Sequence, residues 1–111
     1  MSLNLKIDKE TLIVQIRGEL DHHTAEEIRD KIDYELENGK IKNILFDFSK
    51  LSFMDSSGIG VLMGRYKKIS QRNGQAGVFN VNPQIRRVFE ISGLLRIFKE
   101  FDSKEHALEN M

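Results

Sequence analysis

Two adjacent serines, an aspartate and a glycine stand together as Asp55-Ser56-Ser57-Gly58, between an apolar run and a helical pattern. Residues of these types at the start of a helix accept hydrogen bonds from the free N–H groups of its first turn. A serine hydroxyl at the same place can also be exposed, and a phosphate on it meets the positive end of the helix dipole. The segment therefore predicts a helix cap or a phosphorylation site, with Asp55 opposing the phosphate by its like charge.

Three other kinds of site that use serine or glycine are excluded by the spacing. A nucleophile elbow needs G-x-S-x-G, but Met54 precedes Ser56 by two positions and Asp55 precedes Ser57 by two. A dinucleotide fingerprint needs G-x-G-x-x-G, and Met63 stands in the place of its third glycine. The chain also has no P-loop ending in Gly-Lys-Ser/Thr. No phosphate-cradling motif is therefore found.

Histidines and a further aspartate raise two other hypotheses, a metal site and a receiver domain. His22 and His23 are adjacent, so on a helix they would point about 100° apart, and His106 lies far along the chain. We expect solvated or capping histidines, with no metal and no cofactor. Asp47 could mimic the phosphorylated aspartate of a receiver, but the acidic pair that a receiver needs after its first strand is missing.

Gly60 and Gly64 are four residues apart in the helical pattern, so they lie on one face of the expected helix. A glycine inside a helix costs about 1 kcal/mol relative to alanine. Two such costs indicate close approach of another backbone. That backbone belongs either to the chain's own sheet or to a partner that docks on this face.

The apolar residues divide the chain into alternating strands and helices. Alternation at 3–7 and 12–16 predicts a hairpin whose second strand ends at Gly18, and apolar runs at 41–48, 76–81 and 97–101 predict three further strands. Helical spacing predicts helices at 24–38, 57–72, 83–93 and from 104 toward 111. Their expected caps are Asp21 or Thr24, the latter in a capping box with Glu27, then Asn82 and Ser103.

The resulting order is β-β-α-β-α-β-α-β-α, which favours an α/β sandwich. We expect one domain over residues 1–111, with a mixed sheet of four to five strands and about four helices.

The composition describes an ordinary globular chain. It has 111 residues, 17 basic and 17 acidic, no cysteine, and 40% hydrophobic residues. Zero net charge gives no electrostatic reason for binding nucleic acid or an anionic membrane. The absence of cysteine excludes disulfides and thiolate sites. With no apolar stretch of signal-peptide or membrane-span type, we expect a soluble cytoplasmic protein.

Several motifs together resemble a known family. They span nearly the whole chain: residues 18–26 (GELDHHTAE), 53–61 (FMDSSGIGV), 64–67 (GRYK), 86–89 (RRVF) and 92–94 (SGL). The sequence resembles the bacterial anti-sigma factor antagonists, which have the STAS fold. The D-S-x-G segment is typical of these antagonists in general, and GELDHHTAE points to the sporulation branch.

The resemblance implies a switch controlled by phosphorylation. It implies that Ser56 is the phospho-acceptor, with Ser57 as second choice, and that Asp21 lies near it. The partner would be an anti-sigma factor that is also a serine kinase. The unphosphorylated antagonist binds this kinase and frees the forespore sigma factor, phosphorylation ends the binding, and a serine phosphatase restores it. The remaining residues expected at the phosphorylation site and partner surface are Asp55, Ser57, Gly58, Gly60, Val61 and Gly64.

On this reading the chain acts by binding and is not itself an enzyme. One alternative within the fold is an antagonist of the general-stress branch. A nucleotide-binding STAS protein and a subunit of a membrane transport complex are further alternatives.

Overall fold

The computed structural model describes residues 3–111 and contains two sheets. The larger has the strand order β1-β2-β4-β6-β7, in which β1 is antiparallel to β2 and the other neighbours are parallel. Its strands are β1 (Leu3–Asp8), β2 (Thr11–Ile16), β4 (Asn43–Asp47), β6 (Ala76–Phe79) and β7 (Lys99–Phe101). The smaller sheet pairs β3 (Gly18–Leu20) with β5 (Leu51–Met54) in parallel. The expected mixed sheet of up to five strands is confirmed.

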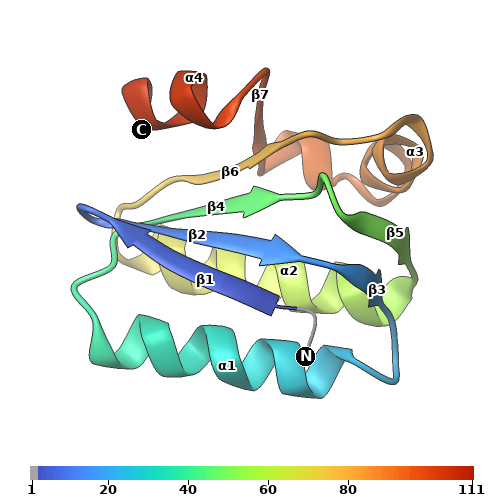
Figure 1. Ribbon diagram of the computed structural model, residues 1–111, viewed down its shortest axis with the longest axis horizontal. Coiled ribbons are helices and arrows are strands. Elements are labelled where there is room, and N and C mark those ends of the chain that lie inside the picture. The colour runs from blue at the N-terminus through green and yellow to red at the C-terminus, as the bar shows by residue number, and fades with distance from the viewer. Residues whose placement is uncertain (1–2) are drawn as a thin grey trace.

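Helices cover both faces of the larger sheet (Figure 1). The helices are α1 (Ala25–Asn38), α2 (Ser56–Gln71), α3 (Pro83–Ser92) and α4 (Lys104–Glu109), with a 3₁₀ turn η1 (Leu94–Arg96) after α3. α1 and α2 lie side by side under one face, and α4 lies against β6 and β7 on the other. α3 contacts β5 at the end of the sheet where α2 begins.

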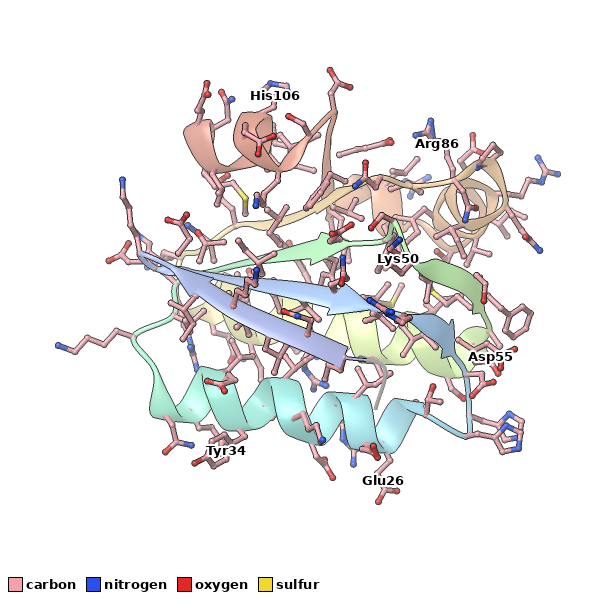
Figure 2. The ribbon with its side chains drawn as sticks, in the orientation of Figure 1. Glu26, Tyr34, Lys50, Asp55, Arg86 and His106 are labelled. Carbon is pink, nitrogen blue, oxygen red and sulfur yellow. The ribbon has the colours of Figure 1, made fainter. Side chains whose placement is uncertain are left out.

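Two apolar clusters fill the spaces between these layers. The larger contains four buried phenylalanines, Phe46, Phe48, Phe89 and Phe98. Their rings meet edge-on or tilted at centroid distances of 5.8–6.0 Å, an arrangement worth about 0.5–1.5 kcal/mol per pair beyond burial. The smaller cluster joins Leu45, Phe79 and Phe101 of the sheet to Ala107 of α4. Outside the core, Tyr34 projects from α1 into solvent (Figure 2).

The structure confirms the caps expected for the last two helices. Asn82 Oδ1 accepts a hydrogen bond from the N–H of Ile85 at 2.8 Å, and Pro83 is the first residue of α3. Gly93 ends α3 at φ +84°, a left-handed conformation that glycine adopts without strain. Ser103 Oγ accepts from the N–H of His106 at 3.0 Å and so caps α4.

Two local expectations are wrong. β3 and β5 were not expected, and Gly18, at φ +93°, turns the chain from the large sheet into the small one where a simple strand end was predicted. The Thr24–Glu27 capping box is also absent. Thr24 has helical backbone angles and makes no side-chain cap, because its hydroxyl donates to the Glu19 carbonyl at 2.9 Å and accepts from the Asp21 N–H at 3.0 Å.

An ion pair ties α2 to α1 in the interior. Arg65 on α2 is 6% exposed, and its Nε lies 3.1 Å from Asp33 Oδ1 on α1. The angles are not those of a hydrogen bond, so the contact is chiefly one of charge. Burial lowers the pKa of Arg65, and the negative charge of Asp33 counters part of this effect.

No helix within residues 3–111 is long and apolar enough to cross a bilayer.

Candidate functional site around the start of helix α2

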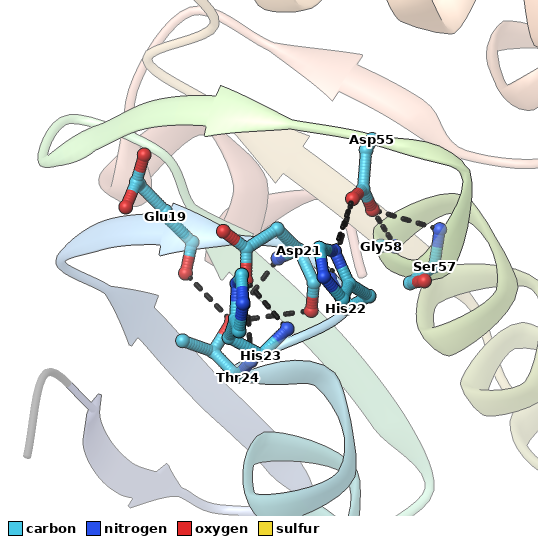
Figure 3. A network of polar contacts seen from close by, with 8 residues as sticks. All are labelled: Glu19, Asp21, His22, His23, Thr24, Asp55, Ser57 and Gly58. Atoms are coloured by element: carbon cyan, nitrogen blue, oxygen red, sulfur yellow. Dashed lines mark hydrogen bonds and ion pairs between the residues drawn. The ribbon is translucent and has the colours of Figure 1, made fainter.

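The pairing of β3 with β5 brings two distant segments of the chain together. Leu20 and Met54 are opposite each other at the ends of these parallel strands. Parallel strands end at the same edge of a sheet. The residues that follow these two strands, Asp21 and Asp55, therefore lie near each other at that edge (Figure 3). The Asp55 N–H continues the contact by donating to the Leu20 carbonyl at 3.3 Å.

Asp55 is the cap of α2. Its Oδ1 accepts hydrogen bonds from the N–H groups of Ser57 at 2.8 Å and Gly58 at 3.3 Å. Its Oδ2 accepts from the N–H of His22, in the loop after β3, at 3.2 Å. One carboxylate thus caps the helix and holds the neighbouring loop (Figure 3).

Because Asp55 makes the cap, Ser56 is left free. Ser56 is the first residue of α2 and is exposed. Its hydroxyl has no hydrogen-bond partner among the residues that the structure describes. Ser57 is less exposed than Ser56, because it is half-buried, and its backbone N–H is bound by Asp55. A reagent arriving from solvent therefore reaches the Ser56 hydroxyl more readily than that of Ser57.

Asp21 organises the loop between β3 and α1. Its Oδ1 accepts from the N–H groups of His23 at 2.9 Å and Thr24 at 3.2 Å, and the residue is 9% exposed. Figure 3 shows this network continuing through the Thr24 hydroxyl to Glu19. Asp21 therefore holds the loop between β3 and α1, and the expectation that it caps α1 is wrong, because the cap position is Thr24.

The two carboxyl groups are held in their charged form. Burial alone would raise the pKa of Asp21, but hydrogen bonds from the backbone of His23 and Thr24 and the nearby imidazoles outweigh it and lower the pKa. Burial acts likewise on Asp55, and hydrogen bonds from Ser57, Gly58 and His22 again lower the pKa. The start of α2 is thus an acidic surface before any phosphate is added.

The glycines expected at this site differ in what surrounds them. A Cβ on buried Gly58 would lie 2.5 Å from Met54 Cγ and 2.6 Å from the Leu20 carbonyl oxygen, so the backbone needs a glycine here. A Cβ on Gly60 or Gly64 would meet no atom within 4 Å. The interpretation that these two glycines pack against the chain's own sheet is therefore wrong. They leave an open helix face.

Val61, expected at the partner surface, and Asp47, considered as a receiver-type aspartate, both have structural roles. Val61 is 6% exposed and packs in the core, so it fixes α2 and offers little surface. Asp47 accepts hydrogen bonds from Gln15, Ser49 and Asn80 at the end of β4. Burial raises its pKa, but these hydrogen bonds outweigh the effect and lower it.

Sequence reasoning missed two features of the site. Phe53 and Met63, on β5 and α2, are 42% and 39% exposed. Met63 follows Ile59 by four residues, a spacing that places both on one face of the helix and so gave no sign that Met63 is exposed. His22 and His23 are exposed as expected, but the contact between His22 and Asp55 joins residues 33 positions apart and has no local signal. Within residues 3–111, no three His, Asp or Glu side chains are grouped to hold a metal.

Comparisons with known proteins show the family of this chain. The STAS domain family matches residues 2–107. An anti-sigma F factor antagonist of Paenibacillus polymyxa is 40% identical over 98% of this chain and 97% of its own length. An anti-sigma-B factor antagonist of Listeria monocytogenes is 30% identical, with 89% of each chain covered.

Solved structures of the anti-sigma factor antagonist SpoIIAA resemble this chain at 36% identity. The unphosphorylated form has a TM-score of 0.86, covering 97% of this chain and 94% of that one. The phosphorylated form, described as a Bacillus cell fate determinant, has a TM-score of 0.77, with 97% of both chains covered. The chain therefore belongs to the STAS domain family and, within it, to the anti-sigma factor antagonists.

Proposed function

We propose that this chain is the antagonist of a sporulation anti-sigma factor and that phosphorylation of Ser56 switches it off. The observation that carries the proposal is the free, exposed Ser56 hydroxyl at the start of α2, next to a cap already made by Asp55. A kinase needs an accessible hydroxyl that it can align with the γ-phosphoryl group of ATP. The phosphorylated form of SpoIIAA, a relative in sequence and fold, supports such a modification.

The proposed partner is the anti-sigma factor, acting also as the serine kinase. The unphosphorylated chain binds it and thereby frees the forespore sigma factor, and a serine phosphatase reverses the phosphorylation. The chain itself acts by binding in the cytoplasm and catalyses no reaction. The open face at Gly60 and Gly64, with Met63 exposed beside it, supports α2 as part of the contact surface.

The charges around Ser56 support an electrostatic switch. A phosphate adds about 1.5–2 negative charges beside the Asp55 carboxylate. The N–H groups of Ser57 and Gly58, which could have bound it, are already taken by Asp55. The phosphate is therefore poorly compensated by the helix and repels an acidic or desolvated contact. Each 1.4 kcal/mol lost at the interface weakens binding about tenfold.

The general-stress branch is the second candidate, because an anti-sigma-B factor antagonist is also similar. The sporulation branch is favoured by the greater identity to an anti-sigma F factor antagonist, 40% against 30%. Measuring affinity for both anti-sigma factors under the same conditions separates the two.

Phosphosite mapping by mass spectrometry tests the proposal. The chain is incubated with the anti-sigma F kinase and ATP, beside the Ser56→Ala and Ser57→Ala variants. We expect one phosphate, on Ser56, in the unmodified chain and in Ser57→Ala, and none in Ser56→Ala. A phosphate on Ser57 alone would keep the switch and correct the residue. No phosphate with this kinase, but one with the general-stress kinase, would reassign the branch.

A further inference from the structure

Two exposed imidazoles stand beside the start of α2, and no part of the proposed switch uses them. The rings of His22 and His23 lie with centroids 3.9 Å apart and an interplanar angle of 39°. Their side chains are 68% and 74% exposed, so the core does not fix them. Figure 3 shows the rings in the loop after β3, next to the carboxylate that caps α2.

Each imidazole faces a different carboxylate. His22 Nδ1 lies 3.6 Å from Asp55 Oδ2, and the His22 N–H donates to that same oxygen at 3.2 Å. His23 Nδ1 lies 3.8 Å from Asp21 Oδ1. Although the rings are neighbours, only His22 faces the residue that directly precedes Ser56.

A phosphate on Ser56 needs a compensating partner that the helix does not supply. The N–H groups of Ser57 and Gly58 are occupied by Asp55, and the adjacent carboxylate repels the phosphate. Imidazole nitrogens donate to phosphate oxygens when the ring is protonated, and such charge-assisted hydrogen bonds are about twice as strong as neutral ones. The backbone contact of His22 with Asp55 holds it beside the residue that directly precedes Ser56.

We propose that protonated His22, in the loop after β3, binds the phosphate of phosphorylated Ser56. The inference rests on the proposed function, since it requires that Ser56 is phosphorylated. The charged groups around the rings are Asp55 from the start of α2, Asp21 from the loop, and α1 residues that line the adjoining surface hollow, Glu26, Glu27, Asp30 and Lys31. Apart from Asp55 and Asp21 these groups lie on α1, so His22 is the basic side chain placed on the side of the loop that faces the start of α2.

This pairing has a measurable consequence for the phosphate. The second ionisation of a phosphoserine occurs near pH 6. A neighbouring positive charge favours the dianion and moves the midpoint to lower pH. Loss of His22 should move it back, whereas loss of His23, which faces Asp21, should do so much less.

The test is a ³¹P NMR titration of the phosphorylated chain over about pH 5–8. His22→Gln is compared with the wild type and with His23→Gln, a matched loss of one imidazole from the same exposed pair. We expect the phosphoserine midpoint in His22→Gln to rise by about 0.5 pH unit or more, with His23→Gln close to wild type. An unchanged midpoint in His22→Gln, or equal shifts in both variants, would refute the inference alone. A chain that mass spectrometry shows to carry no phosphate on Ser56 would refute the proposed function and, with it, this inference.

Discussion

The Asp55 carboxylate binds the backbone N–H of His22 at 3.2 Å, although the two residues are 33 positions apart. The contact exists because β3 and β5 pair in parallel and end together, so the residues after each strand become neighbours. The same carboxylate caps α2 with its other oxygen. A small two-stranded sheet thus fixes the surface on which Ser56 is presented.

The close approach of β3, β5 and α2 makes Gly58 sensitive to any side chain. In Gly58→Ala the new Cβ would overlap the Leu20 carbonyl oxygen and Met54 Cγ, at 2.6 and 2.5 Å. Since a carbonyl of a paired strand cannot move freely, we expect a loss of about 1–3 kcal/mol in the free energy of unfolding. Urea unfolding followed by circular dichroism measures it. A stability equal to wild type would mean that the strand ends are not held as described.

The open glycines of α2 should respond in the opposite way. Alanine at Gly60 or Gly64 meets no atom within 4 Å and favours the helix, so each variant should gain up to about 1 kcal/mol in stability. If this face contacts the kinase, the added methyl groups should weaken binding, and we expect about tenfold for Gly60→Ala. Calorimetric titration with the anti-sigma factor measures the affinity. A variant that is more stable and binds as wild type would place the contact elsewhere.

The paired carboxylates predict how stability depends on pH. Asp21 and Asp55 have pKa values below 3.8 in the folded chain, so near and below pH 4 the unfolded chain binds more protons. Their contribution is therefore complete above about pH 4 and is lost as the pH falls through the folded-state values. Thermal unfolding between about pH 7 and pH 3 should show a falling midpoint in this window.

Asp55→Asn removes the charge of one of these groups, because the amide keeps one acceptor oxygen for the cap while its NH2 group cannot accept from the His22 N–H. The variant should lose part of the acid dependence. Asp102→Asn, at an exposed position outside the network, is the charge-matched control. Parallel pH profiles for all three chains would contradict the role given to Asp55.

The buried ion pair between α1 and α2 should be costly to break from one side. In Asp33→Ala the Arg65 guanidinium stays buried, with its Nη1 lacking any acceptor within residues 3–111, and we expect a loss of about 3 kcal/mol in unfolding free energy. The double variant Asp33→Leu/Arg65→Met removes both charges and should recover much of that loss. Lys68→Met, whose side chain is 38% exposed, should cost less than about 1 kcal/mol. Chemical unfolding of the four chains checks this order.

The sequence predicted those elements whose signals are local. Asn82 and Pro83 begin α3, Gly93 ends it and Ser103 caps α4, because each of these residues acts through its own backbone neighbours. β3 and β5 escaped because three or four residues are too few for an alternating pattern, and their pairing is a long-range contact.

At the site, local patterns identified the segment 55–58 but could not predict which of its residues caps α2. Aspartate and serine both cap helices, so composition alone could not tell whether Asp55, Ser56 or Ser57 would do so. The choice follows from the strand pairing, which fixes Asp55 through its N–H to the Leu20 carbonyl. The tie to His22 follows from the same pairing and needed the fold.

Because the Ser56 hydroxyl makes no hydrogen bond within residues 3–111, variants at this position can test the effect of charge on binding with little change in the stability of the fold. Ser56→Ala and Ser56→Asp both change an exposed side chain without a hydrogen-bond partner among the described residues, so the unfolding free energy should stay within about 0.5 kcal/mol of wild type. Ser56→Ala should bind the kinase and accept no phosphate, whereas Ser56→Asp should bind at least tenfold more weakly, since it adds a second carboxylate beside Asp55. Ser56→Asn is the matched uncharged control for shape. If Ser56→Asn binds as weakly as Ser56→Asp, the switch acts by steric exclusion at this position, and the electrostatic account is wrong.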